Sequence, residues 1–109
     1  MHTHDPMDMQ SQEDAKAAKA LDARVVRDTD ESDFKWLMGS KRGRRIVWRF
    51  LERAGVFRLS FNTNAMTMAF TEGRKNEGLR IIGQIHTLCP DLYPVMTKEA
   101  LHDHRITDD

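Results

Sequence analysis

The 109-residue sequence contains one cysteine, three prolines and no long apolar run. The single cysteine, Cys89, excludes an intramolecular disulfide and any metal or iron–sulfur site that needs several cysteines. No stretch approaches the roughly 18 consecutive apolar residues of a membrane-spanning helix, and the polar start MHTHDPMDMQ differs from a secretory signal. We therefore expect a soluble, intracellular protein with little basis for redox chemistry.

The chain also lacks a net charge, because 17 basic and 17 acidic side chains cancel, but these charges are segregated along the sequence. Residues 1–33 carry nine acids and four bases, residues 34–58 one acid and eight bases, and residues 59–109 seven acids and five bases. The corresponding net charges are −5, +7 and −2. Blocks of opposite sign favour contact between an acidic and a basic surface, within one chain or between copies.

The apolar periodicity predicts an all-α fold of about four to five helices, with one long central helix and a peripheral N-terminal helix. Residues 1–10 show no periodicity, and a first helix is predicted from Ser11 to about Arg27. Its apolar face is thin, so it should lie on another surface or fray; the large apolar residues are Leu21, Val25 and Val26. The acidic run DTDESD, residues 28–33, is expected to end this helix.

Cap residues divide the remaining sequence into further elements. We expect a short helix over 33–38 closed by a left-handed Gly39, a helix over 41–54 between Ser40 and Gly55, an extended connector over 56–61, a long helix from a cap at 62–64 to about Leu88, and a last helix opened by Pro90. The predicted inward residues include Phe34, Leu37, Met38, Ile46, Val47, Phe50, Leu51, Ala54, Phe57, Leu59, Phe61, Met66, Ala69, Phe70, Ile81, Ile82, Ile85, Leu88, Leu92, Tyr93, Met96 and Ala100.

These elements predict three parts of the chain: an acidic N-terminal tail and peripheral helix over 1–32, a helical core domain over 33–101, and a C-terminal tail over 102–109. No period of about 20–50 residues repeats, which excludes a solenoid.

A basic cluster at the start of the predicted helix 41–54 is the first candidate site. Basic residues at a helix N-terminus oppose the helix dipole, so a nearby anion is expected. The anion could be the acidic run 28–33, solvent ions, the acids of a protein partner, or nucleic acid, on whose bases Trp48 could stack. The predicted anion-binding and partner-binding residues are Lys41, Arg42, Arg44, Arg45 and Arg49.

The segment EGRKNEGLR, residues 72–80, is the second candidate, because glycines interrupt a long helix where alanine would be more stable by about 1 kcal/mol per site. Either another backbone or an aromatic ring lies against these glycines, or the segment is an ordinary charged solvent face. The interface candidates are Trp48, Glu72, Gly73, Arg74, Asn76, Gly78 and Arg80.

The sequence supplies no arrangement of residues that supports catalysis, a metal or a cofactor. The His-x-His pairs at residues 2–4 and 102–104 lie in predicted tails and have no second ligand pair. Cys89 precedes Pro90 at a helix junction, where a structural thiol is expected. No Ser-His-Asp or Cys-His set is present, so we expect a protein without enzymatic activity.

Residues 33–100 resemble a small family of tailed-phage proteins named for a late-gene product of a Bordetella phage. The resemblance rests on GRR-x-x-W-R at 43–49, AGVFR at 54–58, SF-x-x-N at 60–64 and EGR-x-N-x-GLR at 72–80. Members are usually encoded among the virion structural genes of short-tailed phages, and the resemblance implies no enzymatic activity.

The resemblance implies a minor virion component at the head–tail junction, in the tail interior, or in an internal core released during DNA ejection. Its partners would be other virion proteins, met in several copies around a symmetry axis, and it would occupy the host cytoplasm during assembly. The alternative is an accessory phage protein that binds nucleic acid through the basic cluster 41–49.

Overall fold

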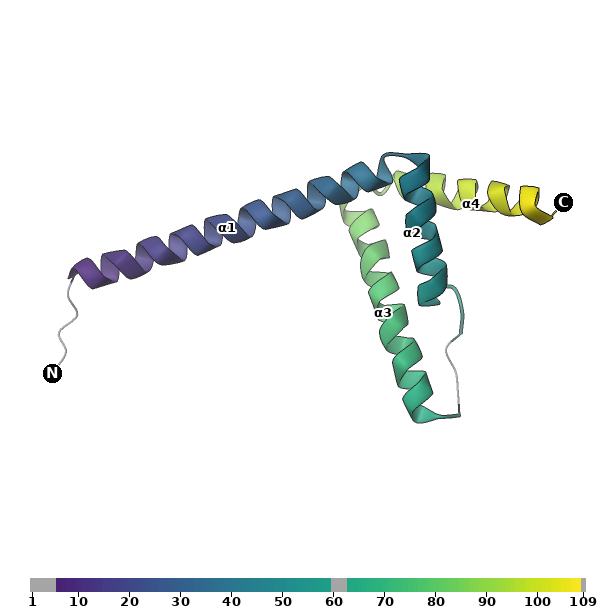
Figure 1. Ribbon diagram of the computed structural model, residues 1–109, viewed down its shortest axis with the longest axis horizontal. Helices are drawn as coiled ribbons and strands as arrows, with labels where there is room; N and C mark the ends of the chain where they lie inside the picture. Colours follow the sequence, from purple (N-terminus) through teal and green to yellow (C-terminus); the bar gives the residue numbers. More distant parts are fainter. Residues whose placement is uncertain (1–5, 60–62, 109) are drawn as a thin grey trace. The chain divides into compact units, whose positions relative to one another are not determined.

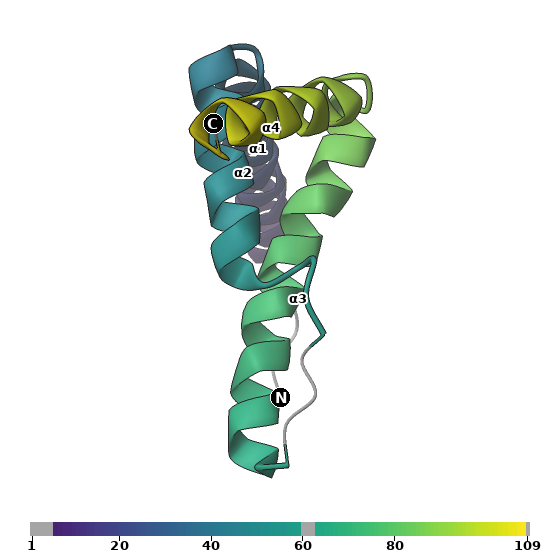
Figure 2. The ribbon, with the colours of Figure 1, turned by 90° about the vertical axis from the view of Figure 1, so that its right-hand side faces the viewer.

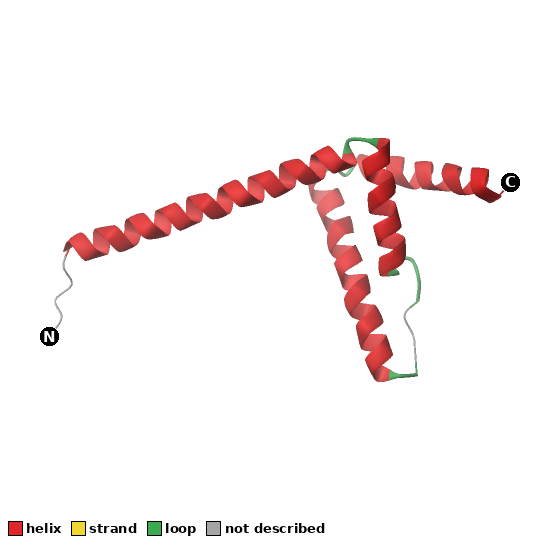
Figure 3. Cartoon of the chain, viewed as in Figure 1, coloured by secondary structure: helices red, strands yellow, loops and turns green. Residues whose placement is uncertain are grey.

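The computed structural model describes residues 6–59 and 63–108, and these ranges form four helices and no strand (Figures 1 and 3). The helices are α1 (Pro6–Met38), α2 (Lys41–Ala54), α3 (Ala65–Leu88) and α4 (Leu92–Asp108). This confirms the predicted all-α class with its long central helix. None of these four helices combines the length and apolar character that crossing a membrane requires.

The chain divides into two compact units, Met1–Asp33 and Phe34–Asp109. The last five residues of α1 belong to the second unit, together with α2, α3 and α4. Helix α4 continues through residues 102–108, the segment predicted to be a tail.

The N-terminal helix is longer than predicted. α1 begins at Pro6, within the stretch predicted to lack periodic structure, and runs unbroken through the acidic run 28–33, so the predicted break and separate helix over 33–38 are wrong. Proline suits a first helical turn, and no glycine or proline lies between Pro6 and Gly39 to end the helix. The hydroxyl of Thr29 donates to the carbonyl of Val25, one turn earlier in the same helix, at 2.8 Å.

The part of α1 in the first unit is exposed throughout residues 7–30. Its large apolar side chains, Leu21, Val25 and Val26, are each more than half exposed. A helix of this kind receives no stabilisation from packing inside its own unit.

In the second unit, α2 and α3 lie side by side and antiparallel, and α4 crosses them near the start of α2 (Figures 1 and 2). The core is small and takes side chains from all four helices: Met38, Val47, Leu51, Ile85 and Met96. Phe34, Leu37, Trp48, Val56, Ile81, Ile82, Leu92 and Tyr93 pack around it in partly buried positions. Most predicted inward residues of α2, α4 and the second half of α3 are therefore confirmed.

Several predicted inward residues are instead exposed. Ile46 and Phe50 are about half exposed, and Met66 and Phe70 are 84% and 70% exposed. The first half of α3 extends beyond the end of α2, so its apolar side chains have no neighbouring helix to pack against (Figure 2). The connector residues Phe57 and Leu59 are 50% and 96% exposed, Ala69 is exposed on α3, and Phe61 lies outside the described residues.

The helix caps largely follow the sequence. Ser40 Oγ accepts from the Gly43 amide at 3.0 Å, Asn64 Oδ1 accepts from the Thr67 amide at 3.0 Å, and Gly55 closes α2 at φ 75°. Gly39 does not adopt the predicted left-handed conformation, which among described residues occurs at Gly55. Pro90 lies in the turn before α4 and not in its first turn, because α4 begins at Leu92.

Two glycines permit close packing in the second unit. A Cβ atom at Gly78 would collide with Val56 Cγ2 and lie 2.9 Å from Ala54 Cβ, whereas a Cβ at Gly73 or Gly83 would meet open space. A Cβ at Gly43 would collide with the carbonyl oxygen of Leu37. Gly78 is therefore closely approached within the chain, but by the aliphatic side chains of Val56 and Ala54 and not by the backbone or aromatic ring that the sequence suggested, and Gly73 has no such neighbour.

Replacing Gly78 by alanine should lower the free energy of unfolding by about 1–3 kcal/mol, because the added methyl group overpacks the contact between α2 and α3. Gly73→Ala and Gly83→Ala are matched controls in the same helix and should be neutral or stabilising by up to about 1 kcal/mol. Thermal unfolding followed by circular dichroism measures all three, and equal melting temperatures would contradict the assigned role of Gly78.

Candidate functional site

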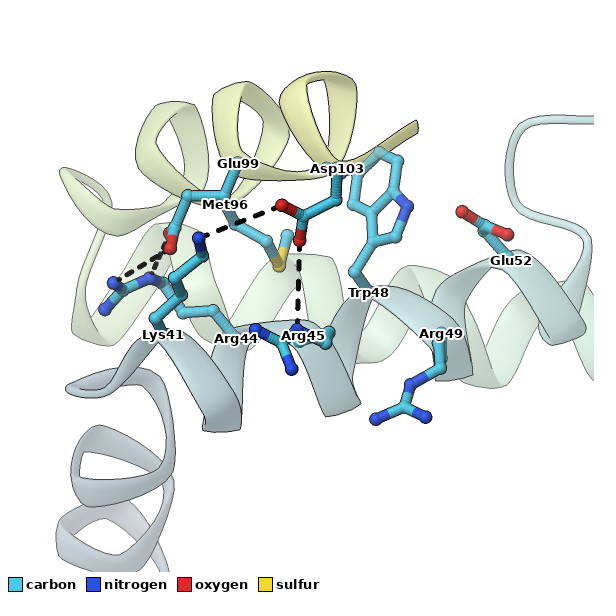
Figure 4. Close-up of a pocket in the computed structure, with 10 residues that line it drawn as sticks. Lys41, Arg44, Arg45, Trp48, Arg49, Glu52, Met96, Glu99 and Asp103 are labelled. Atoms are coloured by element: carbon cyan, nitrogen blue, oxygen red, sulfur yellow. Dashed lines mark hydrogen bonds and ion pairs between the residues drawn. The ribbon is translucent and has the colours of Figure 1, made fainter. Parts of the chain in front are cut away.

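The basic cluster lies on α2 and faces acidic side chains of α4 (Figure 4). Arg44 meets Glu99, while Lys41 and Arg45 meet Asp103. These contacts divide the five predicted anion-binding cations into groups with different environments.

Arg44 has the most extensive set of contacts. Its Nε donates to Glu99 Oε1 at 2.6 Å and its Nη2 to Oε2 at 3.3 Å, while Nη1 donates to the carbonyl oxygen of Met38 at 2.9 Å. The side chains of Arg44 and Glu99 are only 13% and 21% exposed. A two-point guanidinium–carboxylate contact with little access to water is among the stronger ion pairs in proteins. Arg44 therefore connects α2 to α4 and satisfies a carbonyl group at the end of α1.

Lys41 and Arg45 are paired more loosely. Lys41 Nζ lies 3.8 Å from Asp103 Oδ1, and Arg45 Nε lies 3.8 Å from Oδ2 of the same carboxylate. Both cations are about half exposed, and ion pairs of this length and exposure contribute little stability. The two remaining cluster residues, Arg42 and Arg49, make no ion pair with any residue that the structure describes.

The carboxylates that pair with Lys41, Arg44 and Arg45 belong to α4 and not to the acidic run 28–33, which the sequence suggested as the internal partner. A signal was present, because Glu99 and Asp103 are four residues apart and share a helix face with the buried Met96. The anion expected beside the cluster is thus supplied by α4 of the same chain.

A groove of about 200 Å³ runs between α2 and α4 beside these ion pairs (Figure 4). Trp48, Met96 and Ala100 supply its apolar lining, and Glu52 adds a further acid to the charged rim. Trp48 stacks on Phe57 with 5.0 Å between ring centroids, so one use predicted for this ring, stacking on a base, competes with an internal contact. The rim carries charges of both signs, which suits an apolar side chain with a polar end better than a phosphate backbone.

The residues of the segment 72–80 do not join the cluster. Gly78 packs against the end of α2, whereas Glu72, Gly73, Asn76 and Arg80 are exposed on α3. The Arg80–Glu77 pair is an exposed contact at 3.4 Å. Arg74 lies over the ring of Phe70, with 5.6 Å from Cζ to the centroid. Arg74 and Glu77 also line a second groove, together with Phe50, Arg53 and Ala54 of α2.

No three side chains of His, Cys, Asp or Glu gather at metal-binding distances within the described residues. His2 and His4 lie outside those residues, and His102 is exposed on α4. Cys89 is partly buried beside the core, and burial raises the pKa of its thiol while the charge of Lys35 partly opposes this rise. A protonated thiol is a weak nucleophile and a poor metal ligand at neutral pH.

Truncating Arg44 should destabilise the second unit more than truncating its neighbour. Arg44→Ala removes a charged hydrogen-bond network and should cost about 1.5–3 kcal/mol, whereas Arg45→Ala should cost less than about 1 kcal/mol. At about 4–8 °C per kcal/mol for a domain of this size, the difference is measurable by thermal unfolding.

The reversed pair Arg44→Glu with Glu99→Arg should recover part of the stability lost by either reversal alone. Identical melting temperatures for the Arg44 and Arg45 variants, or no recovery in the reversed pair, would contradict the structural role of the Arg44–Glu99 contact.

Comparison with known proteins bears on the second unit. No curated protein and no solved structure matches the chain. The model of one protein family, described as Bbp19-like phage protein, matches residues 34–98. This range begins with the second unit, ends beside Glu99, and agrees with the resemblance seen over residues 33–100. Since the match covers more than half of the sequence, the chain belongs to the Bbp19-like phage protein family.

Proposed function

We propose that this phage protein is a minor structural component of the virion of a short-tailed phage and acts by binding other virion proteins. The observation that carries the proposal is the amount of large apolar surface that the chain leaves uncovered. Met66 and Phe70 on α3, and Leu21 and Val25 on α1, are all more than half exposed. Exposed apolar groups rimmed by charge are typical of surfaces that meet other proteins.

The small core supports the same proposal. Few large side chains are buried in the described part of the second unit, and residues 7–30 are all exposed in the first. A chain that buries so little by itself gains stability by mass action when a partner covers its apolar surface. The working state we propose is therefore an assembly of several copies in the particle, at the head–tail junction, in the tail interior, or in an internal core.

Non-enzymatic action is part of the proposal. The groove between α2 and α4 holds carboxylates that are already engaged with Arg44, Lys41 and Arg45. The thiol of Cys89 has a raised pKa and does not line this groove. A site of this kind can hold a partner's side chain, and it presents no activated nucleophile.

Nucleic-acid binding is the second candidate, and it is favoured by Arg42 and Arg49, which project from α2 without an ion pair among the described residues. Because carboxylates of α4 already engage the other three cations, fewer phosphate contacts are available than five. With about two contacts, the logarithm of DNA affinity should fall with the logarithm of salt concentration at a slope near −2. A slope near −4 to −5 would favour a dedicated DNA-binding protein.

Mass spectrometry of gradient-purified virions should detect the protein at a fixed copy number per particle. Particles from a phage that lacks the gene are the control, and they should show an assembly or infectivity defect. A protein that is abundant in infected cells but absent from purified particles would overturn the proposed virion role.

A further inference from the structure

The outward face of α2 combines arginines with large apolar side chains. Arg42, Ile46, Arg49, Phe50 and Arg53 recur at helical spacings of three and four, which places them on one side of the helix. Ile46 and Phe50 are 49% and 45% exposed. Arg42, Arg49 and Arg53 make no ion pair with described residues, so this side of α2 is strongly basic and partly apolar.

This face continues onto α3. Phe50 and Arg53 share a groove with Arg74 and with Glu77, whose carboxylate pairs with Arg80. Arg74 in turn covers the ring of the exposed Phe70. We call the side chains of Arg42, Ile46, Arg49, Phe50, Arg53, Phe70 and Arg74 the arginine face. It lies within the second unit, and although Arg49 also lines the groove between α2 and α4, none of the seven side chains pairs with Glu99 or Asp103.

A ligand for the arginine face must present acids around a short apolar stripe at helical spacing. The part of α1 in the first unit has this pattern, since Asp14, Leu21, Val25 and Asp28 recur at intervals of seven, four and three on one side of the helix. Leu21 and Val25 are more than half exposed, and residues 1–33 carry a net charge of −5.

The α1 pattern and the α2 part of the arginine face place charged residues on both sides of an apolar pair, and their charges are opposite in sign. Each helix has two large apolar residues four positions apart, Leu21 and Val25 on α1 and Ile46 and Phe50 on α2. The apolar pair of α1 is flanked by aspartates, and that of α2 by Arg42 and Arg53. Arginine forks can meet carboxylates over a range of side-chain rotamers while the apolar pairs exclude water.

We propose that α1 of one copy docks through this acidic stripe onto the arginine face of a second copy. The inference rests on the proposed function in one respect, that a virion component works in several copies. A head-to-tail contact of this type leaves one face free on each end copy, so it propagates into a ring or a chain of subunits.

Charge reversal in the full-length protein tests the contact by sedimentation velocity over a range of concentrations. The first variant, Arg42→Glu with Arg53→Glu, cancels the positive charge of the arginine face, because two glutamates then accompany Arg49 and Arg74; the second, Asp14→Arg with Asp28→Arg, makes both surfaces basic. Each variant alone should associate at least tenfold more weakly than the wild type. An equimolar mixture should associate again, because the acidic stripe of the first variant then meets the unchanged arginine face of the second. Circular dichroism should show that both variants retain the wild-type helix content and melting temperature.

The control variant Arg58→Glu with Lys98→Glu adds the same negative charge at exposed residues outside the arginine face and should associate like the wild type. A mixture that fails to recover association would overturn the proposal, as would a wild type that stays monomeric because α1 folds onto its own chain. Loss of DNA binding in the first variant with unchanged self-association would assign the face to nucleic acid instead and would equally overturn it.

The proposed contact and the proposed virion role can be refuted independently of each other. Recovery in the mixture combined with absence from purified particles would leave the contact standing and refute the proposed function. Presence in particles combined with equal association of all variants would refute the contact alone.

Discussion

The guanidinium of Arg44 is the contact on which the second unit most depends. It binds the carboxylate of Glu99 at two points and a carbonyl oxygen at the end of α1, so three helices meet at one side chain. Among the described residues the core beneath it is small, and its largest fully buried side chains are Met38, Leu51, Ile85 and Met96. Because so little apolar surface is buried, the shielded Arg44–Glu99 pair contributes a large part of the energy that fixes α1, α2 and α4 relative to one another in this unit.

This role changes how the basic sequence GSKRGRR is understood. Gly39 follows the last residue of α1, and Ser40 caps α2. The absence of a Cβ atom at Gly43 lets the α2 backbone approach Leu37. Arg44 then points inward to α4, whereas Arg42, two positions earlier, lies on the opposite side of the helix and makes no ion pair with the described residues. One short basic run thus serves two purposes, internal packing and an outward charged surface, because a helix distributes neighbouring residues over different faces.

The sequence was sufficient to predict the helical class, the caps at Ser40, Gly55 and Asn64, and the buried residues where α2, α3 and α4 meet. These follow from local chemistry and from a period of 3.6 residues, both of which are visible in a single chain. The exposure of Met66 and Phe70 was not predictable in this way, because periodicity identifies an apolar side of a helix but not whether a neighbour covers it. The pairing of Arg44 with Glu99 joins residues 55 positions apart, and no local pattern specifies such a contact. The sequence does not reveal that α1 continues through residues 28–33, because an acidic and polar run can either end a helix or remain helical when it contains no glycine or proline.

The uneven packing of α3 has a consequence for its dynamics. From Gly78 to Leu88 the helix is held against α2 and the core, whereas residues 65–73 are almost entirely exposed. Backbone amides in the first half of the helix should therefore exchange with solvent through local fraying, while those in the second half require opening of the whole unit. A single helix then contains a rigid half that maintains the fold and a half that would become fully ordered only if a partner covered Met66 and Phe70. The conformational entropy lost on ordering would weaken such binding.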